Sequence, residues 1–143
     1  MLVCVPLSTM AAWQKEFEQW GPELNTITYN GNTASRAIIR EYECFSKNGQ
    51  IIFNVLLTNY EMVVKDRQHF SEIEWSNIVI DEAHRLKSED SLLYKVLKDI
   101  GSKHRLLLTG TNLREKVGEG CTVGLCIFLK YHSTLKTPCV SLP

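Results

Sequence analysis

The stretch Asn77-Ile78-Val79-Ile80-Asp81-Glu82-Ala83-His84 decides how this chain folds. Its three consecutive β-branched residues predict a strand buried on both faces, as in a parallel sheet. Two carboxylates and an imidazole follow at the carboxyl end of that strand, where α/β sheets place their ligands. The first carboxylate suits a water-mediated contact with Mg²⁺, the second suits activation of an attacking water, and His84 can reach a neighbouring loop. The alternative role is an acidic cap on the following helix.

Outward from this stretch, short apolar runs alternate with segments of helical periodicity. Such alternation is typical of an α/β fold, a mainly parallel sheet flanked by helices. The expected strands are 2–6, 25–29, 51–57, 77–81 and 105–108, and the expected helices are 10–20, 33–45, 58–69 and 89–100. The expected caps are Ser8 or Thr9, then Thr33, then Thr58 with Glu61 in a capping box, and the acidic residues 89 and 90 favour the N-terminus of the last helix.

The aromatic side chains of the first expected helix have two interpretations, and the basic side chains in and after the second have one that we favour. Trp13, Phe17 and Trp20 recur at helical spacing, which favours packing against the core over stacking on nucleic-acid bases. Arg36, Arg40 and Lys47 are expected to form a solvated face.

Polar clusters follow four of the five predicted strands. They are Ser8-Thr9, Thr58-Asn59, Asp81-Glu82 and Thr109-Gly110-Thr111. Because the carboxyl ends of parallel strands meet at one edge of a sheet, we expect these clusters to form a single active or binding edge.

Composition bounds the class of protein. The chain has 143 residues, 44% hydrophobic, with 16 basic and 16 acidic residues, so it predicts one soluble domain at most and no overall positive field. None of its eight glycines is followed by Lys, which excludes a Gly-x-x-x-x-Gly-Lys-Ser/Thr phosphate loop within these residues. The five cysteines contain no Cys-x-x-Cys pair and are expected to be free thiols.

Four stretches resemble, in order, motifs of helicase superfamily two in the form used by Swi/Snf-type chromatin-remodelling ATPases. Residues 6–9 (Pro-Leu-Ser-Thr) resemble motif Ia, and residues 56–61 (Leu-Leu-Thr-Asn-Tyr-Glu) resemble the next DNA-facing motif. Residues 81–87 (Asp-Glu-Ala-His-Arg-Leu-Lys) resemble motif II, and residues 106–111 (Leu-Leu-Leu-Thr-Gly-Thr) resemble motif III. Segments 13–20, 35–40 and 90–95 further resemble the chromodomain–helicase–DNA-binding (CHD) subfamily.

The resemblance implies a RecA-like lobe, the fold of P-loop NTPases, that is incomplete because it lacks the strand bearing the phosphate loop. It also implies a nucleotide site, in which Asp81 would serve Mg²⁺ through water and Glu82 would activate the hydrolytic water of ATP. His84 would contact the nucleotide with these two carboxylates. Thr109, Gly110 and Thr111 would couple that site to DNA movement.

The resemblance assigns the remaining polar clusters to DNA. Ser8, Thr9, Thr58 and Asn59 would contact phosphates of one DNA strand, positioning the backbone without reading its sequence. Helix capping is the alternative for the three hydroxyls. Partners would be nucleosomal DNA, a second ATPase lobe and upstream chromodomains, in the nucleus.

The sequence departs from the family pattern in three ways. The phosphate loop is missing, as is the second lobe with its arginines. The usual Pro-Leu-Gln-Asn after motif III is replaced by Asn112-Leu113-Arg114-Glu115. We therefore expect residues 1–111 to be a partial ATP-binding lobe. Residues 112–143 are expected to be a divergent tail, from a shifted reading frame, a retained intron or an alternative exon.

Three functional hypotheses follow. The first is a piece of a DNA-dependent chromatin-remodelling ATPase that binds no ATP tightly and cannot hydrolyse it alone. The second is a truncated, non-catalytic isoform that binds DNA or chromatin partners. The third is an unrelated α/β enzyme with a chance acidic motif. Because unpaired strand edges invite aggregation, we also expect marginal stability.

Overall fold

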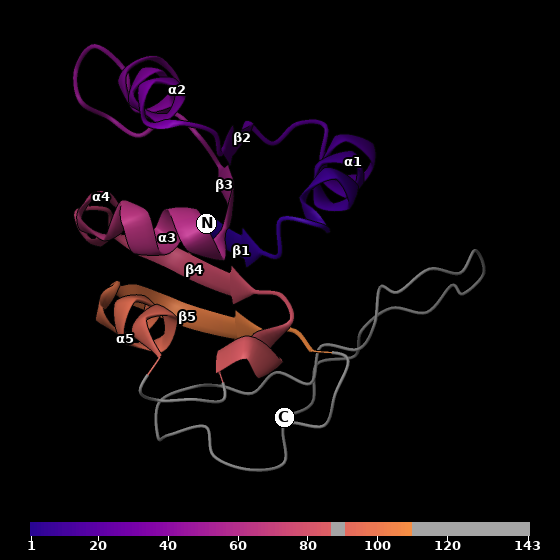
Figure 1. Ribbon diagram of the computed structural model, residues 1–143. Coiled ribbons are helices and arrows are strands. Elements are labelled where there is room, and N and C mark those ends of the chain that lie inside the picture. The colour runs from indigo at the N-terminus through magenta and orange to yellow at the C-terminus, as the bar shows by residue number, and fades with distance from the viewer. Residues whose placement is uncertain (87–90, 110–143) are drawn as a thin grey trace.

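The computed structural model describes residues 1–86 and 91–109, which fold around one five-stranded parallel sheet (Figure 1). The strands are β1 (Leu2–Val5), β2 (Thr26–Tyr29), β3 (Val55–Asn59), β4 (Trp75–Ile80) and β5 (Ser102–Leu107), in the order β2-β3-β1-β4-β5. The register pairs Leu2 with Leu56 on one side and with Ile78 on the other. The α/β prediction is therefore confirmed.

The helices connect these parallel strands. They are α1 (Met10–Trp20), α2 (Thr33–Ile38), α3 (Tyr60–Lys65), α4 (Arg67–Ser71) and α5 (Leu92–Asp99). Helix α2 runs into a π-helix at Ile39–Cys44, and a 3₁₀ turn at Ala83–Leu86 follows β4. Within the part of the chain that the structure describes, no helix is long and apolar enough to cross a membrane.

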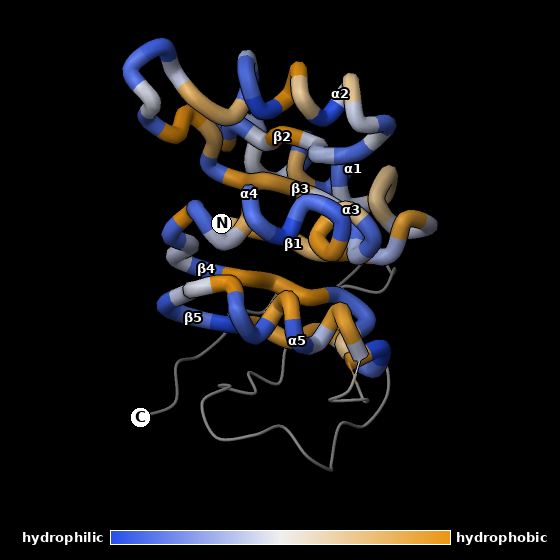
Figure 2. Tube along the Cα trace, turned by 60° about the vertical axis from the view of Figure 1, so that its left-hand side comes forward, coloured by the Kyte–Doolittle hydropathy of each residue, from blue (hydrophilic) through white to orange (hydrophobic). Residues whose placement is uncertain are grey.

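The two faces of the sheet are covered by different helices, because successive side chains of a strand point to opposite faces. Leu2 and Cys4 belong to the core cluster that includes side chains of α3, α4 and α5. Val3 and Val5 belong to a second cluster, closed by Met10, Trp13 and Phe17 of α1. In Figure 1, α1 lies on one side of the sheet and α3 to α5 on the other, and Figure 2 shows the apolar strands between them.

Several predicted boundaries are displaced by one or more residues. Strand β3 begins at Val55 rather than at residue 51, and Ile51 and Ile52 are exposed outside the sheet. The caps of α2 and α3 are Asn32 and Asn59, one residue before or after the predicted threonine, because their amide oxygens accept the free N–H groups of the first turn. Ser91 caps α5. Residues 87–90, including the two acidic residues expected to favour the N-terminus of this helix, lie outside the described residues.

Thr9 precedes α1 as predicted, but its hydroxyl does not cap the helix. It donates instead to the carbonyl oxygen of Pro6 at 3.1 Å, inside the turn that leads from β1 into α1. Trp20 was expected in the core, yet its exposed fraction is 73%. It is the last residue of α1, beyond the apolar residues that contact the sheet.

The predicted solvated face at Arg36 is wrong, because Arg36 is buried with an exposed fraction of only 5%. Its Nε lies 2.6 Å from Oδ2 of Asp66, and its Nη1 donates to the carbonyl of Gly31 at 2.7 Å. Asp66 Oδ2 also accepts the hydroxyl of Tyr29 at 2.6 Å. Arg40 donates to that hydroxyl and lies 3.4 Å from Asp66. These four side chains are called the Asp66 cluster below.

Candidate active site

The acidic pair lies where β4 leaves the sheet, and backbone hydrogen bonds from two other strands fix its position. The N–H of Asp81 donates to the carbonyl of Cys4 in β1 at 2.9 Å. Leu108, just after β5, donates to Ile80 and accepts from Ala83, both at 2.8 Å. The backbone on each side of Asp81 and Glu82 is thus tied to a neighbouring strand.

The carboxylate of Asp81 is held by two donors, one for each oxygen. Oδ1 accepts the backbone N–H of Glu82 at 2.9 Å, and Oδ2 accepts the indole Nε1–H of Trp13 at 3.0 Å. The backbone carbonyl of Asp81 accepts the hydroxyl of Tyr60. The contacts from α1 and α3 were not predicted from the sequence, because they join residues 68 and 21 positions apart.

Glu82 has an unusual backbone conformation. Its φ of 51° lies in the left-handed region, which non-glycine residues adopt at a cost of about 1–2 kcal/mol. Such conformations cluster at functional sites, where neighbouring structure imposes them. Oε2 of Glu82 lies 3.1 Å from Nδ1 of His84, so the two form an ion pair when the imidazole is protonated. Nδ1 has no aligned hydrogen-bond partner among the described residues.

The chemistry of these donors fits Mg²⁺ held through water. The described residues contain no group of three or more His, Cys, Asp or Glu side chains that could coordinate a metal alone. Each oxygen of Asp81 has a second lone pair beyond the one used by Glu82 or Trp13. Mg²⁺ keeps several waters and commonly uses one or two carboxylates with substrate phosphates, so one half-buried carboxylate suffices.

The predicted DNA-facing residues divide into an accessible pair and a buried pair. Ser8 is exposed and Thr9 is half-buried, in the turn after β1. Thr58 is fully buried, and its hydroxyl donates to the carbonyl of Tyr29 at 2.9 Å. Asn59 is also buried, and it caps α3 through Oδ1 while donating to Oδ1 of Asn30 at 3.1 Å. The buried side chains of Thr58 and Asn59 thus hold the connection between β3 and α3 in place through hydrogen bonds.

All of these described residues lie at one edge of the sheet, as predicted for parallel strands. The register aligns Val5 with Asn59, and it aligns Cys4 with both Thr58 and Ile80. Ile80 in turn aligns with Leu107, two residues before Thr109. Gly110, Thr111 and the tail 112–143 lie outside the described residues.

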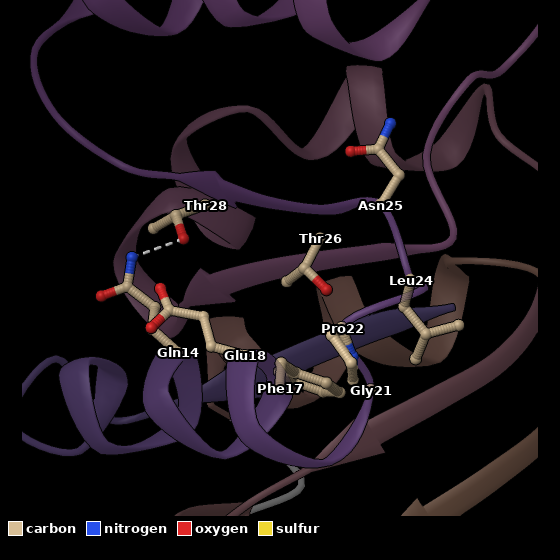
Figure 3. A pocket seen from close by; sticks show the side chains of 9 residues that line it. All are labelled: Gln14, Phe17, Glu18, Gly21, Pro22, Leu24, Asn25, Thr26 and Thr28. Carbon is tan, nitrogen blue, oxygen red and sulfur yellow. Dashed lines mark hydrogen bonds between the residues drawn. The ribbon is translucent and has the colours of Figure 1, made fainter.

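A hollow that Asp81 does not line lies between α1 and β2. Its volume is about 390 Å³, and its rim is largely polar (Figure 3). Gln14 on α1 donates to the hydroxyl of Thr28 on β2 at 2.7 Å across it. The side chains around it are Gln14, Phe17, Glu18, Gly21, Pro22, Leu24, Asn25, Thr26 and Thr28. Nothing in its lining selects a particular ligand.

A parallel α/β sheet with an acidic pair on its carboxyl edge is the arrangement expected of a RecA-like lobe. Comparison with known families makes the assignment specific. The profile of the SNF2-related domain matches residues 1–136, and the chain belongs to that family. The predicted resemblance to Swi/Snf-type ATPases is thereby confirmed.

Individual relatives support the same assignment. The chain is 46% identical over 119 residues to chromodomain-helicase-DNA-binding protein 1 of Gallus gallus, and 47% identical over 126 residues to Protein CHROMATIN REMODELING 4 of Arabidopsis thaliana. Each match covers 82% of this chain, which spans 7% and 6% of the length of those relatives. The Sulfolobus solfataricus SWI2/SNF2 ATPase core in complex with dsDNA matches with a TM-score of 0.63 and 30% identity. That match covers 78% of this chain and 21% of the other.

Proposed function

We propose that this chain provides the acidic motif and the DNA-facing loops of the ATP-binding lobe of a nuclear, DNA-dependent chromatin-remodelling ATPase. The observation that carries the proposal is the placement of Asp81 and Glu82. They lie at the carboxyl edge of the sheet, tied to the strand ends of β1 and β5 and contacted by α1 and α3. One relative named above is called CHROMATIN REMODELING 4, and the other is named for a chromodomain, a helicase and DNA binding, which supports the same assignment.

Each residue at this edge has a proposed task. Asp81 would hold a water of the Mg²⁺ shell, and Glu82 would orient and deprotonate the attacking water. His84 would bind nucleotide beside Glu82, which it already approaches within 3.1 Å. When bound, Mg²⁺ would neutralise charge on the phosphates of ATP. Thr109, with Gly110 and Thr111, would link this site to DNA.

DNA contact would fall on the turn after β1. Ser8 and Thr9 are accessible hydroxyls at this edge, and backbone-directed contacts of this kind need no net positive charge on the whole chain. Thr58 and Asn59 would act in the same interface by fixing the loop between β3 and α3. Nucleosomal DNA, a second ATPase lobe and chromodomains are the proposed partners.

We further propose that these 143 residues do not hydrolyse ATP on their own. They contain no Gly-x-x-x-x-Gly-Lys-Ser/Thr segment, whose backbone amides and Lys would hold the β- and γ-phosphates. A non-catalytic role in binding DNA or chromatin partners is the second candidate. The absence of that segment favours this candidate too, because DNA contact through the turn at Ser8 and Thr9 needs no phosphate loop.

Two measurements on the purified chain test these proposals. Hydrolysis of ATP is measured with and without double-stranded DNA, and we expect no turnover in either condition. A DNA-stimulated rate that disappears in Glu82→Gln would show that the chain is an ATPase by itself. Binding to labelled duplex DNA is measured at two salt concentrations, and we expect salt-sensitive binding that Ser8→Ala with Thr9→Ala weakens. Failure to bind DNA at low salt would refute the DNA-facing assignment.

A further inference from the structure

Asp81 receives hydrogen bonds from both helices that follow the DNA-facing loops. Trp13 lies in the first turns of α1, directly after Ser8 and Thr9, and its indole N–H reaches the carboxylate oxygen Oδ2 at 3.0 Å. Tyr60 is the first residue of α3, directly after Asn59, and its hydroxyl donates to the backbone carbonyl of Asp81. One donor therefore fixes the side chain of Asp81, and the other fixes its backbone.

We propose that Trp13 and Tyr60 are positioning residues, which orient Asp81 and relay occupation of the DNA-facing loops to it. The proposal rests on the proposed function, since it assumes that these loops contact DNA and that Asp81 serves the metal. It adds a physical connection between the two, built from two aromatic side chains that donate hydrogen bonds to Asp81.

The geometry supports a relay because each donor belongs to a short, packed unit. The ring of Trp13 packs with Phe17, their centroids 5.9 Å apart, and both contact the core cluster that contains Val3 and Val5. A shift of the turn at Ser8 and Thr9 would move α1, and with it the indole donor. An indole donor to an ionised carboxylate is a charge-assisted hydrogen bond, which is stronger and more directional than a neutral one.

Tyr60 has a second anchor on the motif itself. The guanidinium of Arg85 lies over its ring at 5.7 Å from the centroid, so the ring is held between the backbone of Asp81 and the side chain of Arg85. Met62, two residues further along α3, donates its N–H to the cap Asn59. A movement of the loop at Asn59 would therefore be passed to Asp81 by one side chain, that of Tyr60.

The positioning role is tested on the full 143-residue chain without any ligand. Trp13→Phe keeps an aromatic ring, although a smaller one, and removes the indole donor, and the same loss of ring volume occurs in the control variant below. We expect the backbone N–H of Glu82, which donates to Asp81 Oδ1 at 2.9 Å, to exchange with solvent about tenfold faster or more in Trp13→Phe and in Tyr60→Phe. The control is Trp75→Phe, which removes an indole bond of 2.8 Å to the carbonyl of Phe70. Trp75 lies at the start of β4, the opposite end of that strand from Asp81.

A spectroscopic signal keeps this test decisive if a variant folds poorly. The three tryptophans, labelled as 5-fluorotryptophan, give three ¹⁹F resonances that are assigned by Trp→Phe substitution. We expect Asp81→Ala to shift the resonance of Trp13 and to leave those of Trp20 and Trp75 in place. Unchanged Glu82 exchange in Trp13→Phe and Tyr60→Phe, or an unmoved Trp13 resonance in Asp81→Ala, would overturn the positioning role.

The relay is tested by adding duplex DNA to the same labelled chain, with binding followed separately by fluorescence anisotropy. We expect bound DNA to shift the Trp13 resonance, and we expect the resonances of Trp20 and Trp75 not to move. DNA binding that leaves Trp13 unmoved would overturn the relay while the proposed function stands. Absence of DNA binding would overturn the proposed function and the relay together, and the ligand-free measurements would still decide the positioning role.

Discussion

Replacing Asp66 by Asn should destabilise the chain far more than any surface substitution. Asp66 is the only acidic member of its cluster, and it accepts from Tyr29 and from the buried Arg36, each at 2.6 Å. Asn keeps the shape of the side chain and removes the charge. Arg36, whose side chain is only 6% exposed, would then be a buried cation without a counter-ion.

The expected loss in the free energy of unfolding is about 3 kcal/mol. Breaking a buried ion pair by removing one partner costs roughly 3–5 kcal/mol, and we take the lower end because the Asp66 side chain is still 17% exposed. For a domain of this size, that loss lowers the midpoint of thermal unfolding by roughly 10 °C or more. It is also a large share of the 5–15 kcal/mol that typically stabilises a domain.

Urea unfolding at pH 7, followed by circular dichroism, measures this loss. The matched control is Glu61→Gln, which breaks an exposed pair with Lys65 of the same 2.6 Å distance and should leave the midpoint unchanged. Adding Arg36→Met to Asp66→Asn should cost less than the two single losses combined, because the orphaned cation is removed. A loss below about 0.5 kcal/mol in Asp66→Asn would refute the view that this cluster is buried and coupled.

Three more predictions concern single residues. His69 lies among aromatic rings, and burial, with the charge of Arg40, lowers its pKa in the folded chain. The unfolded state then binds its proton first, so stability should fall as the pH drops below about 6.5, and His69→Phe should flatten that part of a urea-midpoint profile. Asn59→Ala should cost about 1–2 kcal/mol in urea unfolding because α3 loses its cap, whereas Thr33→Ala should be close to neutral. Burial raises the pKa of Cys4 to about 12, so iodoacetamide at pH 8 should leave this thiol unlabelled in the native chain, and modification as fast as in urea would contradict its burial.

The strands and their common edge could be predicted because the relevant signals are local. The run at 78–80 is apolar on both faces, and the geometry of parallel strands then brings residues such as Ser8 and Asp81 to one edge. The observed caps lie one residue from the predicted ones because neighbouring Asn and Thr side chains can accept from the same N–H groups. Asn32 and Thr33 are such adjacent candidates. Local patterns cannot decide that competition.

Long-range pairs could not be predicted from local patterns. Arg36 is a charged residue on a short helix, so its residue type predicts a solvated position, and its partner Asp66 is 30 residues away. The bond from Trp13 to Asp81 likewise requires β1 to lie beside β4, because only that strand order brings the start of α1 next to the end of β4. Residue spacing alone carries no information about that order.

The central place of β1 has a consequence for how the chain acquires its structure. This strand comes first in the sequence, yet both of its neighbours lie far downstream, with Leu2 aligned to Leu56 and to Ile78. During synthesis from the amino end, its four buried residues must therefore wait, unpaired, until residues 55–80 are available. Closing such long loops costs entropy before any contact repays it, so folding should be slow and late rather than progressive. A nascent chain exposes this apolar strand at least until residue 80 has been made, and transiently exposed apolar strands are a reason why chaperones are needed.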